Sequence, residues 1–320
     1  MINVKYYEQR SAYDADKPNM ILPNVSYCED TDEVLYTPKP HDYSNDYLTF
    51  VAEEDGTFSF NKKGTGDDIQ YSLDEGVTWT TLASETDSPT VHAGGKIMWK
   101  ATLTPDMYAG NGIFYSSGKF IAQGNAMSLL YGDGFKGQTS LSGKTYAFHS
   151  SFSGCTGLTS AENISLPATT LANTCYFNMF NGCTSLTTAP SLPATTLAGS
   201  CYADMFYGCT SLTTAPSLPA VTLASGCYES MFARCTSLTT APVLPATTLE
   251  SSCYSNMFDG CTNLNKITCL ATDKSASYCT MGWVYGVAAT GTFTKAASMT
   301  SWKTGTSGIP SGWTVEDYQP

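Results

Sequence analysis

The sequence carries little charge, and most of that charge is negative. Only 14% of the 320 residues are charged, with 16 Lys and Arg against 28 Asp and Glu, which gives a net charge of -12. A protein that binds nucleic acid gathers Lys and Arg on one face, and the sequence has no such cluster. It also has no run of 18 or more apolar residues, so no membrane-spanning helix is expected. We therefore expect neither nucleic-acid binding nor membrane insertion.

Motifs of metal binding and catalysis are missing as well. The chain has three histidines, no C-x-x-C pair and no G-x-x-x-x-G-K-[ST] loop, so we expect no metal site and no phosphate-binding loop. No Ser/His/Asp set or recurring carboxylate pair stands in a motif context, so the chain is predicted to be no enzyme and to use no cofactor. The first residues, MINVKYYEQRSAYDADK, lack the apolar core of a secretory signal. We expect the chain to fold in the compartment where it is made.

What the sequence does contain is a repeat. The stretch MFNGCTSLTTAPSLPATTLAGSCYAD, residues 179–204, returns almost unchanged at Met205 and Met231 and begins again at Met257. A fixed period of roughly 20 to 50 residues is typical of solenoids, propellers and arrays. In each 26-residue copy, CYxxMFxGC spaces its apolar residues at three and four, which predicts a helical turn, and SLTTAPxLP predicts a short strand. The predicted fold is a leucine-rich-repeat solenoid with a short helical turn and a short parallel strand in each copy, whose core comes from stacking.

Ten of the 12 cysteines fall into two columns of this repeat. Stacked copies lie about 4.8 Å apart, so distance alone would allow disulfides between neighbours. Each column holds an odd number of cysteines, however, and their side chains would point inward in parallel. The missing signal sequence also favours a reducing compartment. Cysteine is readily buried as a small apolar residue, so we expect a reduced ladder in the core. The two columns are Cys155, Cys183, Cys209, Cys235 and Cys261, and Cys175, Cys201, Cys227, Cys253 and Cys279.

The repeat resembles the BspA-like class of leucine-rich repeat. In that class a phenylalanine is followed three residues later by a cysteine and then by a leucine, as Phe180, Cys183 and Leu186 are here. An apolar strand that ends in proline comes next, as at Pro193, although Pro190 replaces an apolar strand residue and shortens the expected strand. Proteins of this class occur on the surface of gut Bacteroidales and among the proteins encoded by their phages. The resemblance implies adhesion or recognition rather than catalysis.

The flanking sequence divides into further parts. Residues 1–46 hold four prolines and little apolar material, which predicts an extended N-terminal attachment arm. Such an arm would add strands to the sheet edge of a neighbour, or else fold back on its own β domain. Residues 47–104 alternate and turn like a small all-β, sandwich-like domain. The remaining parts are a connector over 105–134, the BspA-like repeats over 135–286 and a C-terminal β cap over 287–320.

One hairpin of the predicted β domain contains an Asp-box, with Ser72, Asp74, Gly76 and Trp79 in the pattern S-x-D-x-G-x-x-W. The pattern occurs in sialidases and in many proteins that are not enzymes. Its physical role is to form a turn, in which Asp74 accepts backbone hydrogen bonds, Gly76 permits a positive φ and Trp79 packs beneath. A glycan-active enzyme built on this box is the remote alternative, and it would require further carboxylates around Asp74.

Comparison of the copies gives a candidate recognition surface. The residues that vary lie around the predicted helical turn, on the face expected to be opposite the strands, where rigid aromatics provide contact area at low entropic cost. Free drift at exposed positions is the alternative interpretation. The Thr pairs, such as Thr187-Thr188, form a second regular surface that could bind ice or glycans, although Thr also reflects β-propensity alone. The best candidates among the varying residues are Phe177, Asn181, Asp204, Tyr207, Glu229 and Asp259, and the others include Asn178, Ala203, Ser230, Ala233, Ser255 and Asn256.

These observations predict a phage virion protein, such as a head or tail fibre, an appendage or a capsid decoration, that presents its repeats to the host surface. Such a protein is made in the host cytoplasm and released by lysis, so it needs no leader. Its expected partners are other virion proteins, bound through residues 1–46, and a host-surface glycan or protein. The resemblance to phage appendages suggests a homotrimer. The alternative is a BspA-like adhesin on a bacterial cell surface.

Overall fold

The computed structural model describes residues 25–28, 33–36, 41–66, 68–105, 112–300 and 302–319. The chain divides into two compact parts, Met1–Asp42 and Tyr43–Pro320. In the first part, β1 (Val25–Cys28) pairs antiparallel with β2 (Glu33–Tyr36). The rest of the attachment arm predicted over residues 1–46 lies almost wholly outside the described residues. Among those that are described, no helix is long and apolar enough to cross a membrane.

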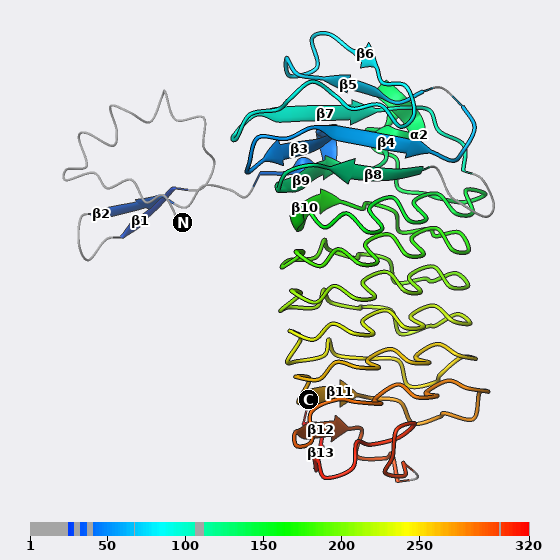
Figure 1. Cartoon of the computed structure of the whole chain (residues 1–320). Helices are drawn as coiled ribbons and strands as arrows, with labels where there is room; N and C mark the ends of the chain where they lie inside the picture. The colour runs from blue at the N-terminus through cyan, green and yellow to red at the C-terminus, as the bar shows by residue number, and fades with distance from the viewer. Residues whose placement is uncertain are drawn as a thin grey trace. The chain divides into compact units, whose positions relative to one another are not determined.

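The second part begins with β layers (Figure 1). A six-stranded sheet has the order β10-β9-β3-β7-β5-β6, and β4 and β8 form a separate antiparallel pair. The elements up to the repeats are η2 (Tyr43–Asn45), β3 (Leu48–Ala52), β4 (Phe58–Lys62), β5 (Gln70–Ser72), β6 (Thr80–Thr81), β7 (Lys96–Lys100), β8 (Gly112–Ser116), β9 (Phe120–Asn125), α2 (Ser128–Tyr131), η3 (Gly132–Gly134) and β10 (Leu158–Ser165).

The core of these layers is aromatic. Phe50 on β3 lies 4.9 Å from Phe114 on β8 and 4.8 Å from Phe120 on β9, measured between ring centroids. It also contacts Phe152 at 5.7 Å, and Phe152 belongs to the first repeat. Residues 105–134, which the sequence analysis assigns to a connector, instead contribute β8, β9 and α2. Because β9 also pairs in parallel with β10, the β layers and the repeats share one core.

The prediction of a leucine-rich-repeat solenoid, with a helical turn and a strand in each copy, is wrong. Among the described residues the single α-helix is α2, which precedes the repeats. Between residues 166 and 265 the chain forms turns, bends and isolated bridges, with neither a helix nor a strand. The strands of the molecule belong to the β layers and to a C-terminal sheet. The fold is therefore mainly β, and its repeats are stacked turns (Figure 1).

Each copy contains a ribbon of consecutive turns in place of the expected helix. Every fourth residue of the ribbon has a positive φ, as at Thr174, Asn178 and Gly182. The N–H groups of residues 175, 177, 179 and 181 close turns within the copy, as Met179 N–H does by donating to the carbonyl of Tyr176 at 3.2 Å. The alternate N–H groups leave the copy, and Phe180 N–H donates to the carbonyl of Met205 in the next copy at 2.9 Å. A helix would need these donors within its own segment, so the ribbon excludes it.

This turn ribbon holds the copies together. From residues 174–182, five N–H groups donate to carbonyls 25 residues further on, at 2.8 to 3.0 Å. The same five bonds recur from residues 200–208, 226–234 and 252–260. We call these four segments the turn ribbon. Since the bonding repeats with the sequence period, identical side chains from successive copies lie one above the next.

The aromatic columns illustrate this register. The Phe180 and Phe206 rings are 5.5 Å apart and inclined by only 2°, and the Tyr202 and Tyr228 rings are 5.9 Å apart and inclined by 4°. All four side chains are at most 1% exposed. Complete burial of one such ring stabilises the fold by about 2 to 3 kcal/mol, so the columns are a major source of stability.

The stack ends in a parallel sheet formed by β11 (Lys266–Cys269), β12 (Thr292–Lys295) and β13 (Thr314–Asp317). Trp283 occupies the next position of the aromatic columns, 6.2 Å from Tyr254. Its indole N–H donates to the carbonyl of Gly308 at 2.8 Å, and its ring contacts Phe293 and Trp302. Residues 287–320 thus provide bulky side chains where the repeated sequence stops.

Candidate recognition surface

The structure places the six best candidates from the sequence on the turn ribbon or beside it. All six side chains are half-buried rather than exposed, namely those of Phe177, Asn181, Asp204, Tyr207, Glu229 and Asp259. The expectation that every varying position faces solvent is wrong at Ala203, Ala233 and Ser255, which are each 1% exposed. These three small side chains share repeat positions with the half-buried Glu229, Tyr207 and Asp259, so the position in the copy does not by itself decide exposure.

Several of the candidates contact one another or the ribbon rather than projecting from it. Phe177 stacks on His149, with ring centroids 5.1 Å apart and planes inclined by 15°. The guanidinium of Arg234 lies 5.3 Å from the centroid of the Tyr207 ring. Asn181 donates through its side-chain amide to the Asn178 side chain at 2.9 Å. Much of the binding capacity of these groups is therefore used within the fold.

Two of the candidates, Asp204 and Glu229, are acidic and lie where ionisation of a carboxyl group is unfavourable. Burial and, second, the negative charge of Glu229 raise the pKa of Asp204 to about 6, while a hydrogen bond with Ser230 acts in the opposite direction. Burial also raises the pKa of Glu229. The neighbouring copies bring the two carboxyl groups together, because Asp204 N–H donates to the carbonyl of Glu229 at 2.8 Å. A pair of like charges at this position costs stability at neutral pH.

The other side of each copy has a different structure. We call residues 187–197, 213–223 and 239–249 the proline side, since each segment carries the TAPxLP sequence. Parallel bridges join Thr188 to Thr214 and Thr196 to Thr222. Between these bridges, no backbone hydrogen bond joins the described residues of adjacent copies. Proline has no N–H to donate, so a ladder is interrupted where two proline-containing segments face each other, whereas residues 239–249 are hydrogen-bonded to residues 266–273, which contain no proline.

A surface groove follows these unbonded boundaries. Its first section has a volume of about 420 Å³ and lies between Thr188–Ser191 and Thr214–Ser217, with Glu162 at one end. Its second section, of about 460 Å³, continues from Ala215–Pro219 to Val243 and Pro245. The two sections share Ala215, Pro216 and Ser217, so they form one depression across successive copies. We call this depression the proline groove.

The proline groove has apolar walls with polar groups at its rim. Val243 is 50% exposed, which is high for an apolar side chain. Ser191 and Ser217 stand at the equivalent position in the other copies. The sequence analysis missed the groove because it considered proline only as a residue that shortens a strand. The signal was the pairing of prolines in every copy, which removes donors at the same place in each and leaves adjacent copies unjoined there.

The cysteine columns lie in the interior. All eleven cysteines whose side chains the structure describes are free and buried, including Cys269, which the two predicted columns do not contain. In the first column four of the five thiols donate to a phenylalanine carbonyl of the preceding copy, as Cys209 does to Phe180 at 3.1 Å and Cys235 to Phe206 at 3.1 Å, whereas Cys155 lies 3.9 Å from the Ser116 hydroxyl. Burial raises the pKa of Cys269 to about 12. A thiol in this setting is neutral at physiological pH and unsuited to nucleophilic chemistry.

The Asp-box residues form the turn between β5 and β6. Asp74 accepts hydrogen bonds from Thr78, at 2.8 Å from the backbone N–H and 2.6 Å from the hydroxyl. These bonds, together with one from the Ser72 hydroxyl, lower the pKa of Asp74 to about 2. Gly76 has a φ of 86°, and its carbonyl accepts from the Trp79 indole N–H at 3.1 Å. Each of these groups has a role in the turn itself.

Within the described part of the chain, no three His, Cys, Asp or Glu side chains are grouped so that they could hold a metal ion. No protein-family model, curated protein or solved structure matches the chain. The physical character of its surfaces is therefore the basis for assigning a function.

Proposed function

We propose that this chain is a non-catalytic recognition protein of a phage virion, and that it adheres to a host surface through the proline groove. The observation that carries the proposal is the groove itself, which runs across successive copies where their backbones are not joined. Exposed apolar area beside unbonded backbone N–H and carbonyl groups is typical of a surface that binds another molecule.

The construction of the stack supports this role. The five hydrogen bonds on the turn ribbon and the aromatic columns hold adjacent copies in register without any contribution from the groove. A ligand in the groove therefore meets a surface that is already ordered, and the entropic cost of binding is low. Host-surface glycans and host proteins are both suited to an elongated site of this kind.

The virion setting rests on the resemblance of the repeats to proteins encoded by phages, and on the division of the chain. Met1–Asp42 forms a compact part of its own, as a segment that attaches to other virion proteins would. Immunogold labelling of phage particles tests the setting. Label confined to the envelope of uninfected cells would favour the alternative, a bacterial cell-surface adhesin.

The adhesion test uses the purified full-length protein, a fluorescent label and cultured Bacteroidales cells. Ser217→Arg and Val243→Arg fill the groove with a long charged side chain, whereas Thr262→Arg adds the same side chain at an exposed position outside it. We expect the two groove variants to lose at least tenfold in cell-bound fluorescence and the control to retain it. Equal binding by all three variants would remove the groove from the proposal.

A further inference from the structure

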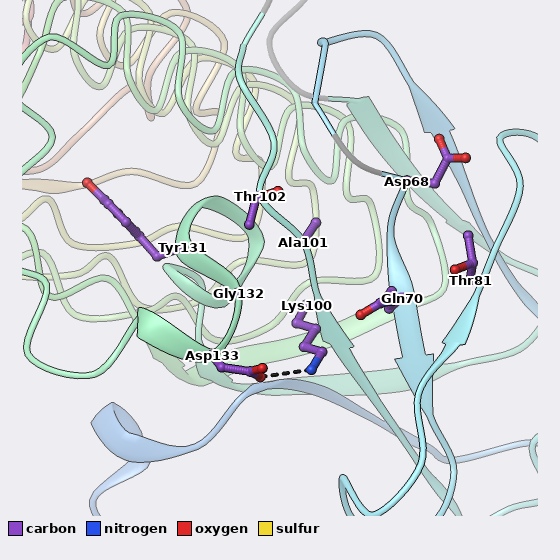
Figure 2. A pocket seen from close by; sticks show the side chains of 9 residues that line it. All are labelled: Asp68, Gln70, Thr81, Lys100, Ala101, Thr102, Tyr131, Gly132 and Asp133. Carbon is purple, nitrogen blue, oxygen red and sulfur yellow. Dashed lines mark hydrogen bonds and ion pairs between the residues drawn. The ribbon is translucent and has the colours of Figure 1, made fainter.

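A second pocket lies in the β layers, apart from the repeats (Figure 2). Its volume of about 390 Å³ is within the range of roughly 300 to 1,000 Å³ that small-molecule sites occupy. Strands β5, β6 and β7 and the segment from α2 to η3 supply its walls. The residues that matter to its chemistry are Asp68, Gln70, Thr81, Lys100, Tyr131 and Asp133.

The charges of this pocket are already compensated. Lys100 Nζ lies 2.8 Å from Asp133 Oδ1, the ion pair drawn in Figure 2, and Tyr47 Oη donates to the same oxygen at 2.7 Å. Both bonds lower the pKa of Asp133, so its carboxylate is ionised at neutral pH. Asp68 is paired in the same way with Lys62 at 2.8 Å. An anionic ligand would meet two carboxylates, and for a cationic ligand both carboxylates are already paired with a lysine, Lys100 in the wall and Lys62 beyond it, so the pocket favours a neutral ligand.

The hydrogen-bonding groups of the pocket further restrict the kind of ligand that it can bind. The two carboxylates can only accept hydrogen bonds, and each has lone pairs beyond those used by its lysine. The Gln70 amide and the Thr81 hydroxyl have no partner in the described part of the chain. Lys100 is committed, since it pairs with Asp133 and lies 4.3 Å above the Trp79 ring, with its side chain only 13% exposed. Acceptors therefore outnumber available donors, and a ligand that fits must carry several hydroxyl groups.

We propose that this pocket binds a neutral mono- or disaccharide. Vicinal hydroxyls of a sugar would donate to Asp68 and Asp133, and the Gln70 amide can both donate and accept. This site is separate from the proline groove, so the proposal does not depend on whether the groove is an adhesion surface.

Saturation-transfer NMR on the full-length protein tests the proposal, with glucose, galactose, mannose, N-acetylglucosamine, maltose and lactose at millimolar concentration. We expect at least one of these sugars to bind, with an affinity that added NaCl leaves unchanged, because no net charge is involved. The double variant Gln70→Leu/Thr81→Val should weaken that binding by roughly tenfold or more, since two hydrogen bonds are lost. Thr247→Val, at an exposed threonine on the proline side, is the matched control and should bind as the unmodified protein does.

Thermal unfolding of the variants separates loss of the site from loss of the fold. Thr81 is exposed, so Thr81→Val alone provides a folded variant even if the double variant is unstable. The proposal is overturned if none of the six sugars binds, or if binding persists undiminished in the Thr81→Val and double variants. It is also overturned if sulfate or spermidine binds in preference to the sugars, because the argument from compensated charge would then be wrong.

Discussion

Replacement of Asp204 by asparagine should stabilise the protein at neutral and alkaline pH and have a smaller effect at acidic pH. The Asp204 carboxyl is half-buried on the turn ribbon, where burial and the charge of Glu229 raise its pKa from 3.8 to about 6. A group whose folded pKa is raised binds its proton more tightly in the folded protein than in the unfolded chain. The penalty to folding therefore develops as the pH rises from the unfolded pKa of 3.8 to the folded value of about 6, is complete above about 6 and is absent below the unfolded value.

The magnitude follows from these two pKa values. A carboxyl whose pKa rises from 3.8 to about 6 loses roughly 3 kcal/mol of folding free energy when it is fully ionised. Partial exposure of the side chain to solvent reduces this, so we expect a gain of about 1 to 3 kcal/mol for Asp204→Asn at pH 8. Asp204 also has a φ of 53°, which asparagine tolerates well, but that contribution does not depend on pH.

The assay is urea unfolding of both proteins from pH 3.5 to pH 8. The difference in the free energy of unfolding should grow as the pH rises from about 4 to about 6, level off above that and be smallest at pH 3.5. Asp273→Asn serves as the control, because hydrogen bonds from Ser275 lower the pKa of Asp273 and no gain at pH 8 is expected there. A difference for Asp204→Asn that is constant with pH would refute the electrostatic reasoning and leave only the backbone effect.

Three further predictions concern the interior and the ribbon. The eleven cysteines from Cys155 to Cys279 should react with Ellman's reagent only after unfolding in guanidinium, since burial raises their thiol pKa values, for Cys261 to about 12; rapid labelling of more than one of the 12 thiols in the native protein would contradict this. Phe206→Ala should cost about 3 to 5 kcal/mol in urea unfolding because it opens a gap in a completely buried column, and a cost below 1 kcal/mol would mean that the rings contribute little. Gly208→Ala should cost roughly 1 to 2 kcal/mol through its φ of 70° alone, as the added methyl group meets no atom closer than 3.9 Å; an unchanged midpoint would show that the ribbon relaxes.

The sequence was sufficient to predict which residues share a column but not the backbone that brings them together. The period of 26 residues assigns Phe180 to Phe206 and Cys183 to Cys209, and the structure stacks those rings and buries those thiols. Apolar residues at 175, 179 and 183 fit a helix, yet a ribbon with one turn every four residues has almost the same spacing. Spacing alone cannot distinguish them, because the distinction depends on whether alternate N–H groups donate within the copy or to the next one.

The candidate surface was predicted less well, for a related reason. The choice of variable positions assumed that all of them face solvent, and small residues such as Ala203 and Ser255 are instead buried. Apart from the change from Ser217 to Val243, the residues that line the proline groove are alike in the copies, so comparison of the copies did not reveal it. A count of backbone donors would have done so, since Pro190 and Pro193 each remove an N–H from a segment that would otherwise join its neighbour.

The two sides of the stack differ in how the backbones of adjacent copies are joined. On the turn ribbon every boundary between copies has five backbone hydrogen bonds, and the aromatic and cysteine columns pack directly beneath it. On the proline side the boundary between residues 187–197 and 213–223 has bridges at its ends and none between, and the described residues of the boundary between 213–223 and 239–249 have no bridge. Because the stack does not depend on bonds there, side chains at the groove can change from Ser217 to Val243 without disturbing the register of the copies. A surface that can change while the core repeats is what a protein needs in order to track a varying ligand, and this fold provides it where proline removes the ladder.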